Sequence, residues 1–257
     1  SDQPDIPIDE LVIRQINRYF IWGTAETLTP GAYRKGENKV GSFTPPDQGD
    51  VPPLMRSFAL WLQADDETHP VLKAGIAHVH LVAVHPFWDG NGRTARGLAT
   101  LVLQRSRFGF RKMLSLESLL FQNRDDYFSA IGRTLGKGYA AAYDATRWLQ
   151  FFVLALSSNA NALTAWLSEW HRIMDELHKH GAAEGLLPRH IDGFMYAQHT
   201  RHITRSDYIE VTGVSPMTAS RDLALLVDRG MLIAEGKTRS RVYYPSKSAP
   251  DSQGASP

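Results

Sequence analysis

One stretch of twelve residues, HPFWDGNGRTAR at positions 85–96, carries the side chains with the clearest chemical use. A histidine stands at the end of an apolar segment, and two glycines follow in a loop that leads into a new helix. Backbone amides at a helix N-terminus bind anionic groups such as phosphate. The stretch therefore predicts a phosphate-binding loop with a histidine beside it.

The charged residues of this stretch sharpen that prediction. Asp89 could hold a hard divalent cation such as Mg²⁺ against phosphate oxygens. Arg93 and Arg96 are three residues apart on the following helix, so both can face the same phosphates. His85 is placed to take a proton from an attacking hydroxyl, a contribution worth roughly 10²–10⁴ in rate. A Walker A loop is excluded, because its lysine and its spacing are absent.

Helices must position this loop. Pro70 opens an apolar segment, Val71–Val84, that predicts a buried central helix ending before Pro86. Periodicity predicts further helices at Asp9–Phe20, Val51–Leu62, Arg93–Gln104, Asp125–Ile131, Ala145–Leu156 and Ala162–His178. Two short extended pieces around Gly36-Glu37-Asn38 favour a small hairpin. The fold class predicted is mainly α.

The last fifty residues have a different pattern. A short helix at Thr204–Glu210 is followed by a turn and by a second helix that Ser215 caps. Residues 231–233 and 241–244 then read as two strands. Residues 201–247 hold eight basic and five acidic residues, a net charge of +3, whereas the whole chain of 257 residues carries +1. The near-neutral chain is not a generally polybasic protein, but this segment is basic.

Composition sets further limits. The chain has no cysteine, which excludes disulfides, thiolate chemistry and cysteine-ligated zinc. No apolar run approaches the roughly 18 residues that span a bilayer, and the N-terminus has no signal-peptide pattern. We expect a cytoplasmic protein with no membrane contact.

The twelve-residue stretch resembles the motif of the Fic family, His-Pro-Phe-x-Asp/Glu-Gly-Asn-Gly-Arg-x-x-Arg. Pro30-Gly31-Ala32-Tyr33-Arg34 and Pro45-Pro46 also look like family segments, so the resemblance covers roughly residues 8–160. It implies a compact helical domain that transfers AMP from ATP to a Ser, Thr or Tyr hydroxyl of a protein target and releases pyrophosphate. Other nucleotidyl or phosphate transfer, or removal of AMP, stays open at the same site.

The resemblance also implies residue roles. His85 would be the base, and Asp89 would hold Mg²⁺. The segment Val40, Gly41, Ser42 and Phe43 would be a flap that docks the target backbone by strand addition. The nucleotide would contact Asp89, Gly90, Asn91, Gly92, Arg93, Thr94, Ala95 and Arg96, with Asn123 and Tyr127 beside the adenine.

The C-terminal segment resembles the winged-helix modules of bacterial repressors. Met217, Thr218 and Arg221 would reach base edges. Lys237, Arg239 and Arg241 of the wing would contact DNA phosphates. The alternatives are a module that binds protein, and a transcriptional regulator that carries a Fic domain.

The domains expected are a Fic domain at 1–160 with its flap at about 34–46, a helical linker at 161–200, a winged helix at 201–247 and a disordered tail at 248–257. The inhibitory motif Ser/Thr-x-x-x-Glu-Gly/Asn of many Fic proteins is absent from the sequence. We therefore expect an inhibitory helix that has been removed or acts in trans, and a second copy of the chain is a further candidate partner. His78 and His80 are interpreted as core residues and not as metal ligands.

Overall fold

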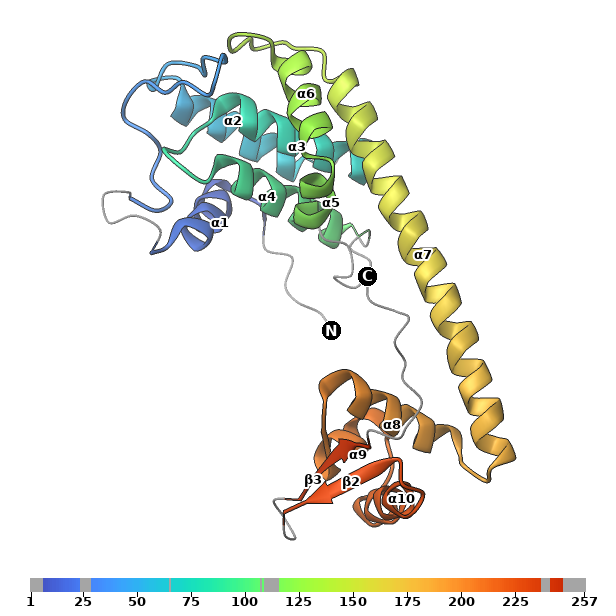
Figure 1. Cartoon of the computed structure of the whole chain (residues 1–257). Coiled ribbons are helices and arrows are strands. Elements are labelled where there is room, and N and C mark those ends of the chain that lie inside the picture. Colours follow the sequence, from blue (N-terminus) through green and yellow to red (C-terminus); the bar gives the residue numbers. More distant parts are fainter. Residues whose placement is uncertain are drawn as a thin grey trace. The chain divides into compact units, whose positions relative to one another are not determined.

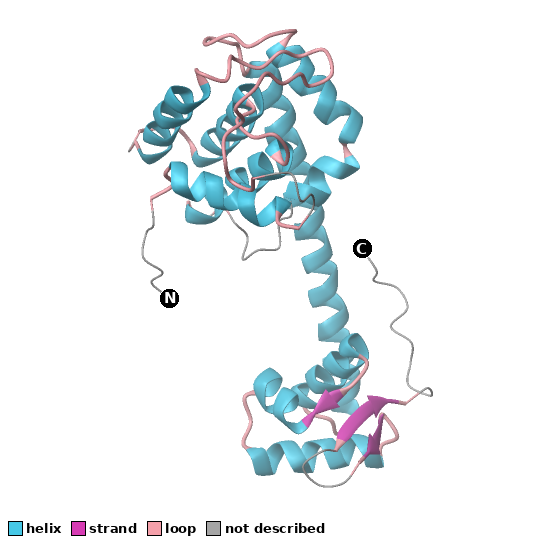
Figure 2. Cartoon of the chain, turned by 90° about the vertical axis from the view of Figure 1, so that its left-hand side faces the viewer, coloured by secondary structure: helices cyan, strands magenta, loops and turns pink. Residues whose placement is uncertain are grey.

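The computed structural model describes residues 7–23, 29–64, 66–106, 108, 116–236 and 241–246. Over these ranges the chain is mainly helical, with one small antiparallel sheet (Figures 1 and 2). It divides into two compact units, Ser1–Thr164 and Ala165–Pro257. No helix in the described part of the chain combines the length and the apolar character needed to cross a bilayer.

The first unit is built from helices. They are α1 (Glu10–Ile21), α2 (Val51–Gln63), α3 (Pro70–Val84), α4 (Asn91–Arg105), α5 (Leu116–Gln122), α6 (Arg124–Leu135) and the N-terminal part of α7 (Thr146–Ala183). Sequence signals set their ends: the Asp9 carboxylate caps α1 by accepting the Val12 amide at 2.8 Å, and prolines stand in the first turns of α2 and α3.

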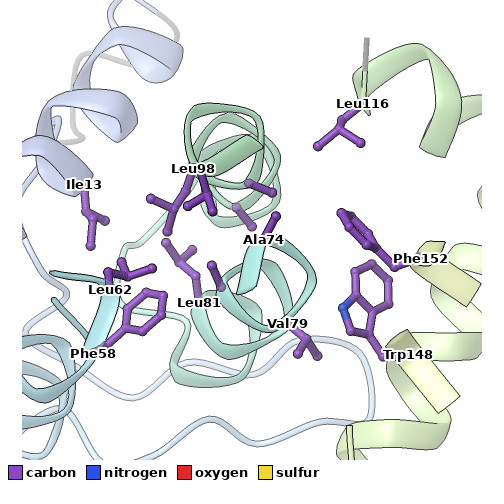
Figure 3. Packing of buried hydrophobic residues seen from close by; sticks show 14 of the residues in the cluster. Ile13, Phe58, Leu62, Ala74, Val79, Leu81, Leu98, Leu116, Trp148 and Phe152 are labelled. Atoms are coloured by element: carbon purple, nitrogen blue, oxygen red, sulfur yellow. The ribbon is translucent and has the colours of Figure 1, made fainter. Parts of the chain in front are cut away.

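The expected central helix is confirmed, because α3 lies at the middle of the core of the first unit. Leu98 of α4 and Leu81 of α3 meet on one side of α3, and Trp148 and Phe152 of α7 lie on its other side (Figure 3). The Trp148 indole donates to the Gly75 carbonyl at 2.7 Å. A Cβ at Gly75 would lie 2.8 Å from Leu149, so glycine allows α7 to pack this closely.

Three expectations about elements of the fold need correction. The hairpin is a single bridge between Val40 and Phe43, turned at Gly41 with φ +60°, and not a pair of strands around residues 36–38. The two helices expected at 145–156 and 162–178 are one helix, α7. The helix α5 was not expected, and α8 lies inside the expected helical linker as a separate helix.

The second unit holds α8 (Pro188–Thr200), β1 (Ile203–Thr204), α9 (Arg205–Thr212), α10 (Pro216–Asp228), β2 (Leu232–Glu235) and β3 (Val242–Pro245). Its sheet has the order β1-β3-β2 and is antiparallel throughout. Phe194 and Ala197 of α8 belong to the same core as Tyr208 and Leu223. α8 is therefore part of this unit, although residues 161–200 were expected to be a linker. The tail at 248–257 lies outside the described residues.

Candidate active site in the first unit

His85 ends the central helix in an uncommon backbone conformation. Its φ of +49° and ψ of +56° are left-handed, and its amide still donates to the Leu81 carbonyl at 2.9 Å. Left-handed backbone is costly for a residue with a side chain and marks functional positions. The Arg34 Nε donates to the His85 carbonyl at 3.0 Å and so holds this turn in place.

Burial keeps the His85 imidazole neutral. It lowers the pKa of His85 from 6.5 to about 4, and Arg34 adds to the decrease, while the Val82 backbone and Asp89 oppose it. The ring is therefore unprotonated at neutral pH, as a general base must be. Because Nδ1 is buried, Nε2 is the nitrogen that can meet a hydroxyl group.

The loop after His85 builds an anion cradle at the N-terminus of α4. Gly90 is the N-cap with φ +77°, and a Cβ there would lie 2.5 Å from the Ile21 side chain. The Asn91 side chain closes the loop, because it accepts the Phe87 amide at 2.9 Å and donates to the Phe87 carbonyl at 2.8 Å. The first amides of α4, at Asn91, Gly92 and Arg93, have no helical carbonyl to bond and can hold phosphate oxygens.

The next two motif residues, in the first turns of α4, face the interior. Thr94 is fully buried, and its hydroxyl donates to the Gly90 carbonyl at 2.8 Å. Ala95 is also fully buried. Their side chains stabilise the cradle from behind, so contact between these two residues and a nucleotide would be limited to the backbone.

Asp89 and Arg93 form an ion pair at the mouth of the cradle. Arg93 Nη2 lies 3.0 Å from Asp89 Oδ2, and Arg93 Nη1 donates to the Phe20 carbonyl at 3.0 Å. Half of the Asp89 side chain is exposed. Among the described residues no three acidic or histidine side chains gather into a metal site. Mg²⁺ is usually bound by one or two carboxylates plus substrate phosphates, and the single exposed Asp89 carboxylate fits that mode.

Arg96 makes a two-pronged ion pair with Glu117 of α5. Arg96 Nε and Glu117 Oε2 are in direct contact, and Arg96 Nη2 lies 2.9 Å from Glu117 Oε1. The guanidinium also lies over Gly92, where a Cβ would be 3.4 Å from Nη1. The second arginine of the motif therefore stands beside the cradle, but a carboxylate of the same chain holds it. Sequence reasoning missed Glu117.

Two further residues that position the loop were not assigned that role from the sequence. Asn17 of α1 is fully buried; its amide donates to the Asp89 carbonyl at 2.9 Å and to Thr94 Oγ1 at 3.2 Å, and its oxygen accepts the Gly31 amide. Arg34 is buried and also donates to the carbonyls of Gly36 and Pro46. Its position in a family-like segment was the only signal for it.

The expected flap is an exposed turn anchored at its base. Val40 and Phe43 exchange backbone hydrogen bonds of 2.9 and 3.0 Å, and Gly41 and Ser42 are exposed between them. The Thr44 amide donates to the Lys137 carbonyl, which ties the turn to the loop after α6. The Trp88 ring of the motif loop lies against Gly36, where a Cβ would be 2.9 Å away.

Of the two residues expected beside the adenine, Asn123 is the N-cap of α6 and donates to the Leu119 carbonyl. Tyr127 is buried, and its hydroxyl lies 3.4 Å from Nε2 of His78. A pocket of about 270 Å³ lies where Tyr127, Arg96 and Glu117 meet. His78 itself stacks on Trp148, and burial lowers its pKa to about 3, which fits a core residue.

Of the residues expected to bind DNA, Met217, Arg221 and Arg241 are exposed, and Thr218 is half-buried. Met217, Thr218 and Arg221 lie on α10, and Arg241 directly precedes β3. Lys237 and Arg239 lie outside the described residues.

Known proteins resemble the part of the chain that holds this site. The model of the Fic/DOC family matches residues 7–103. The matched part of the chain extends from α1 through most of the motif helix α4.

Two curated relatives carry the name protein adenylyltransferase Fic. The protein from Nematostella vectensis is 36% identical over 130 residues, which are 50% of this chain and 28% of the relative. The protein from Drosophila melanogaster is 37% identical over 106 residues, 40% of this chain and 21% of the relative. The chain thus spans about a quarter of the length of these relatives.

Solved structures share the fold. A Fic family protein from Desulfovibrio desulfuricans G20 matches with a TM-score of 0.53 at 19% identity, over 94% of this chain and 70% of that one. A Fic domain containing signalling protein from Bacteroides thetaiotaomicron matches with a TM-score of 0.50 at 26% identity, over 60% of this chain and 62% of that one.

Proposed function

We propose that the first unit is a protein adenylyltransferase, which transfers AMP from Mg-ATP to a Ser, Thr or Tyr hydroxyl of a protein target. The observation that carries the proposal is the neutral His85 beside the open amides at the N-terminus of α4. The relatives named protein adenylyltransferase Fic support the same reaction.

In this proposal the hydroxyl oxygen of the target attacks the α-phosphorus of ATP, and the bond from that phosphorus to pyrophosphate breaks. His85 Nε2 takes the hydroxyl proton. The amides of Asn91, Gly92 and Arg93 stabilise the negative charge that develops on the phosphate oxygens. Asp89 would hold Mg²⁺, which neutralises phosphate charge when it is bound.

The flap would select the target by its backbone. In the described part of the chain the backbones of Val40 and Phe43 bond to each other, and the exposed Gly41–Ser42 edge would pair with an extended segment. Strand addition of this kind fixes the position of the acceptor with little dependence on its side chains.

Label transfer tests the proposal. The protein is incubated with cell extract and ATP labelled at either the α- or the γ-phosphate. The proposal predicts protein-bound label from α-labelled ATP alone, and none with His85→Ala, which should still bind ATP and retain its melting temperature. Label from the γ-phosphate would indicate phosphate transfer instead, and equal labelling by His85→Ala would refute the catalytic role.

We also propose that the second unit is a winged-helix module that binds DNA. Its order α8-β1-α9-α10-β2-β3 matches a helix–turn–helix followed by a β-hairpin wing. A pocket of about 420 Å³ bounded by α9, α10 and the sheet is lined by Arg205, Arg241, Ser206 and Ser220 and by one carboxylate, that of Asp228. Its two arginines support phosphate contact in this groove.

Binding to fragments of the protein's own promoter, measured by fluorescence anisotropy at several salt concentrations, tests this second proposal. We expect the affinity to fall steeply with salt and to weaken in Arg221→Ala and Arg241→Ala. Arg133→Ala, an exposed arginine of the first unit, is the control. Absence of binding at low salt would favour the alternative of a protein-binding module.

A further inference from the structure

The C-terminal half of α7 carries an apolar stripe that we call the α7 stripe. Its members recur at spacings of one, three and four residues, which place them on one face of a helix. They are Trp166, Leu167, Trp170, Ile173, Met174 and Leu177. Trp166 is 41% exposed, and its ring stacks on that of Trp170 with 6.0 Å between the centroids.

The α7 stripe belongs to neither of the hydrophobic cores described for the two units. The core of the second unit is formed by α8, α9, α10 and the strands, and α7 contributes no side chain to it. Trp166 is exposed and the other five side chains are half-buried, and none of the six belongs to either core in the described structure. A surface of this kind usually marks an interaction site.

Charged residues are confined to the other side of this part of α7. Arg172 pairs with Glu169 at 2.6 Å and with Glu176 at 2.7 Å, so these charges are neutralised within the helix. The α7 stripe itself contains no charged residue. A membrane surface is a poor partner, because helices that lie on membranes have a polar face rich in lysine and arginine, whereas this face carries more acidic than basic residues.

The spacing of the α7 stripe points to a second helix of the same kind. Together with Leu163, the residues Leu167, Trp170, Met174 and Leu177 follow the alternating four-three spacing of a coiled-coil seam. A seam with this spacing is complementary to itself, since each knob fits a hole formed by the same residues on the facing helix. Trp166 and Ile173 flank the seam and widen it.

We propose that the α7 stripe is the interface through which two copies of this chain form a symmetric dimer. Two such helices would bury on the order of 1,000 Å² in total, the lower end of the range for specific interfaces. The dimer is therefore expected to dissociate in the micromolar range and to be visible only above it. This inference does not depend on the reaction that the first unit catalyses.

Sedimentation equilibrium from about 1 to 200 µM tests the proposal. The full chain should pass from monomer to dimer over this range. The double variant Leu167→Glu with Met174→Glu should raise the dissociation constant of the dimer at least tenfold. The matched control is Asn161→Glu with Ala165→Glu, which adds the same charges on the exposed opposite side of α7 and should dimerise like the parent. Circular dichroism verifies that both variants keep their helices.

Cysteine cross-linking identifies the contact directly, because the parent chain has no cysteine. Leu167→Cys should form a disulfide dimer by itself if the helices run parallel. If they run antiparallel, it should cross-link with Met174→Cys when the two variants are mixed. Either pattern, with no cross-link from Ala165→Cys, supports the proposal. A monomer at 200 µM, or a dimer that the Leu167/Met174 double variant leaves intact, would overturn it.

Discussion

Replacing Glu117 by glutamine should strengthen the binding of ATP and leave the binding of AMP unchanged. In the described structure the Glu117 carboxylate contacts both Nε and Nη2 of Arg96. The resemblance to the Fic motif implies that Arg96, its second arginine, positions the terminal phosphate of ATP. The carboxylate and the terminal phosphate then compete for one guanidinium, and glutamine removes the charge but keeps the size of the competitor.

The structure sets the size of the effect. The Glu117 side chain is 62% exposed and that of Arg96 is 19% exposed, so solvent screens the pair and its contribution is at most about 1 kcal/mol. Since 1.4 kcal/mol corresponds to tenfold in affinity, we expect a decrease of about three- to fivefold in the Kd for ATP. AMP lacks the terminal phosphate and does not compete with Glu117.

Titration calorimetry with Mg-ATP and with AMP measures both affinities. Glu67→Gln, which removes one exposed negative charge elsewhere in the first unit, controls for the general change in charge. Equal changes for ATP and AMP, or a change as large in Glu67→Gln, would refute the reasoning. So would an unaltered ATP affinity in Glu117→Gln, because Arg96 would then not exchange the carboxylate for phosphate.

Three other predictions concern the residues that support the two units. Asn17→Ala removes a buried amide that bonds Asp89, Thr94 and Gly31. We expect the free energy of unfolding, measured in urea, to fall by about 2–3 kcal/mol and label transfer to become slower. Full activity would contradict the positioning role of Asn17. Burial lowers the folded-state pKa values of His78, His80 and His85 to about 3, 4 and 4, from 6.5 in the unfolded chain. The free energy of unfolding is therefore highest above pH 6.5 and decreases as the pH falls from about 6.5 towards about 4. The slope is about 1.4 kcal/mol per pH unit for each histidine, and melting curves at pH 7.5, 6 and 5 that coincide would exclude it. Asp222→Ala leaves Arg189, His190 and Tyr208 without their shared buried carboxylate, and hydrogen exchange should show a second unit weakened by about 2–3 kcal/mol while the first unit keeps its protection.

Much of the active site could be predicted from the sequence because its members are neighbours in the chain. His85, Asp89 and the glycines after it need no long-range contact to be identified, since residue type and spacing already describe an anion-binding turn. Asn17 could not be found in this way. Its partners lie 14, 72 and 77 positions away, and a lone asparagine in an amphipathic helix has no local signal.

Glu117 illustrates the same limit, because its partner Arg96 lies 21 positions away in the sequence. Helix boundaries depended on weaker signals. Two helices were expected on either side of residues 157–161, but α7 runs through this segment without a break. Polar residues on an exposed helix surface cost little stability. The turn at Val40–Phe43 forms where Gly41 can take a left-handed backbone, and not at the Gly36-Glu37-Asn38 sequence that resembled a turn.

The pH dependence of AMP transfer, measured as kcat/KM for ATP with saturating Mg²⁺, tests the role of His85 most directly. This quantity reports the ionisation of the free enzyme. With a His85 pKa of about 4, the base is already unprotonated at pH 6, so the account predicts a constant value from pH 6 to 8. A rise of about fourfold over that range, the signature of a histidine with the ordinary pKa of about 6.5, would contradict it.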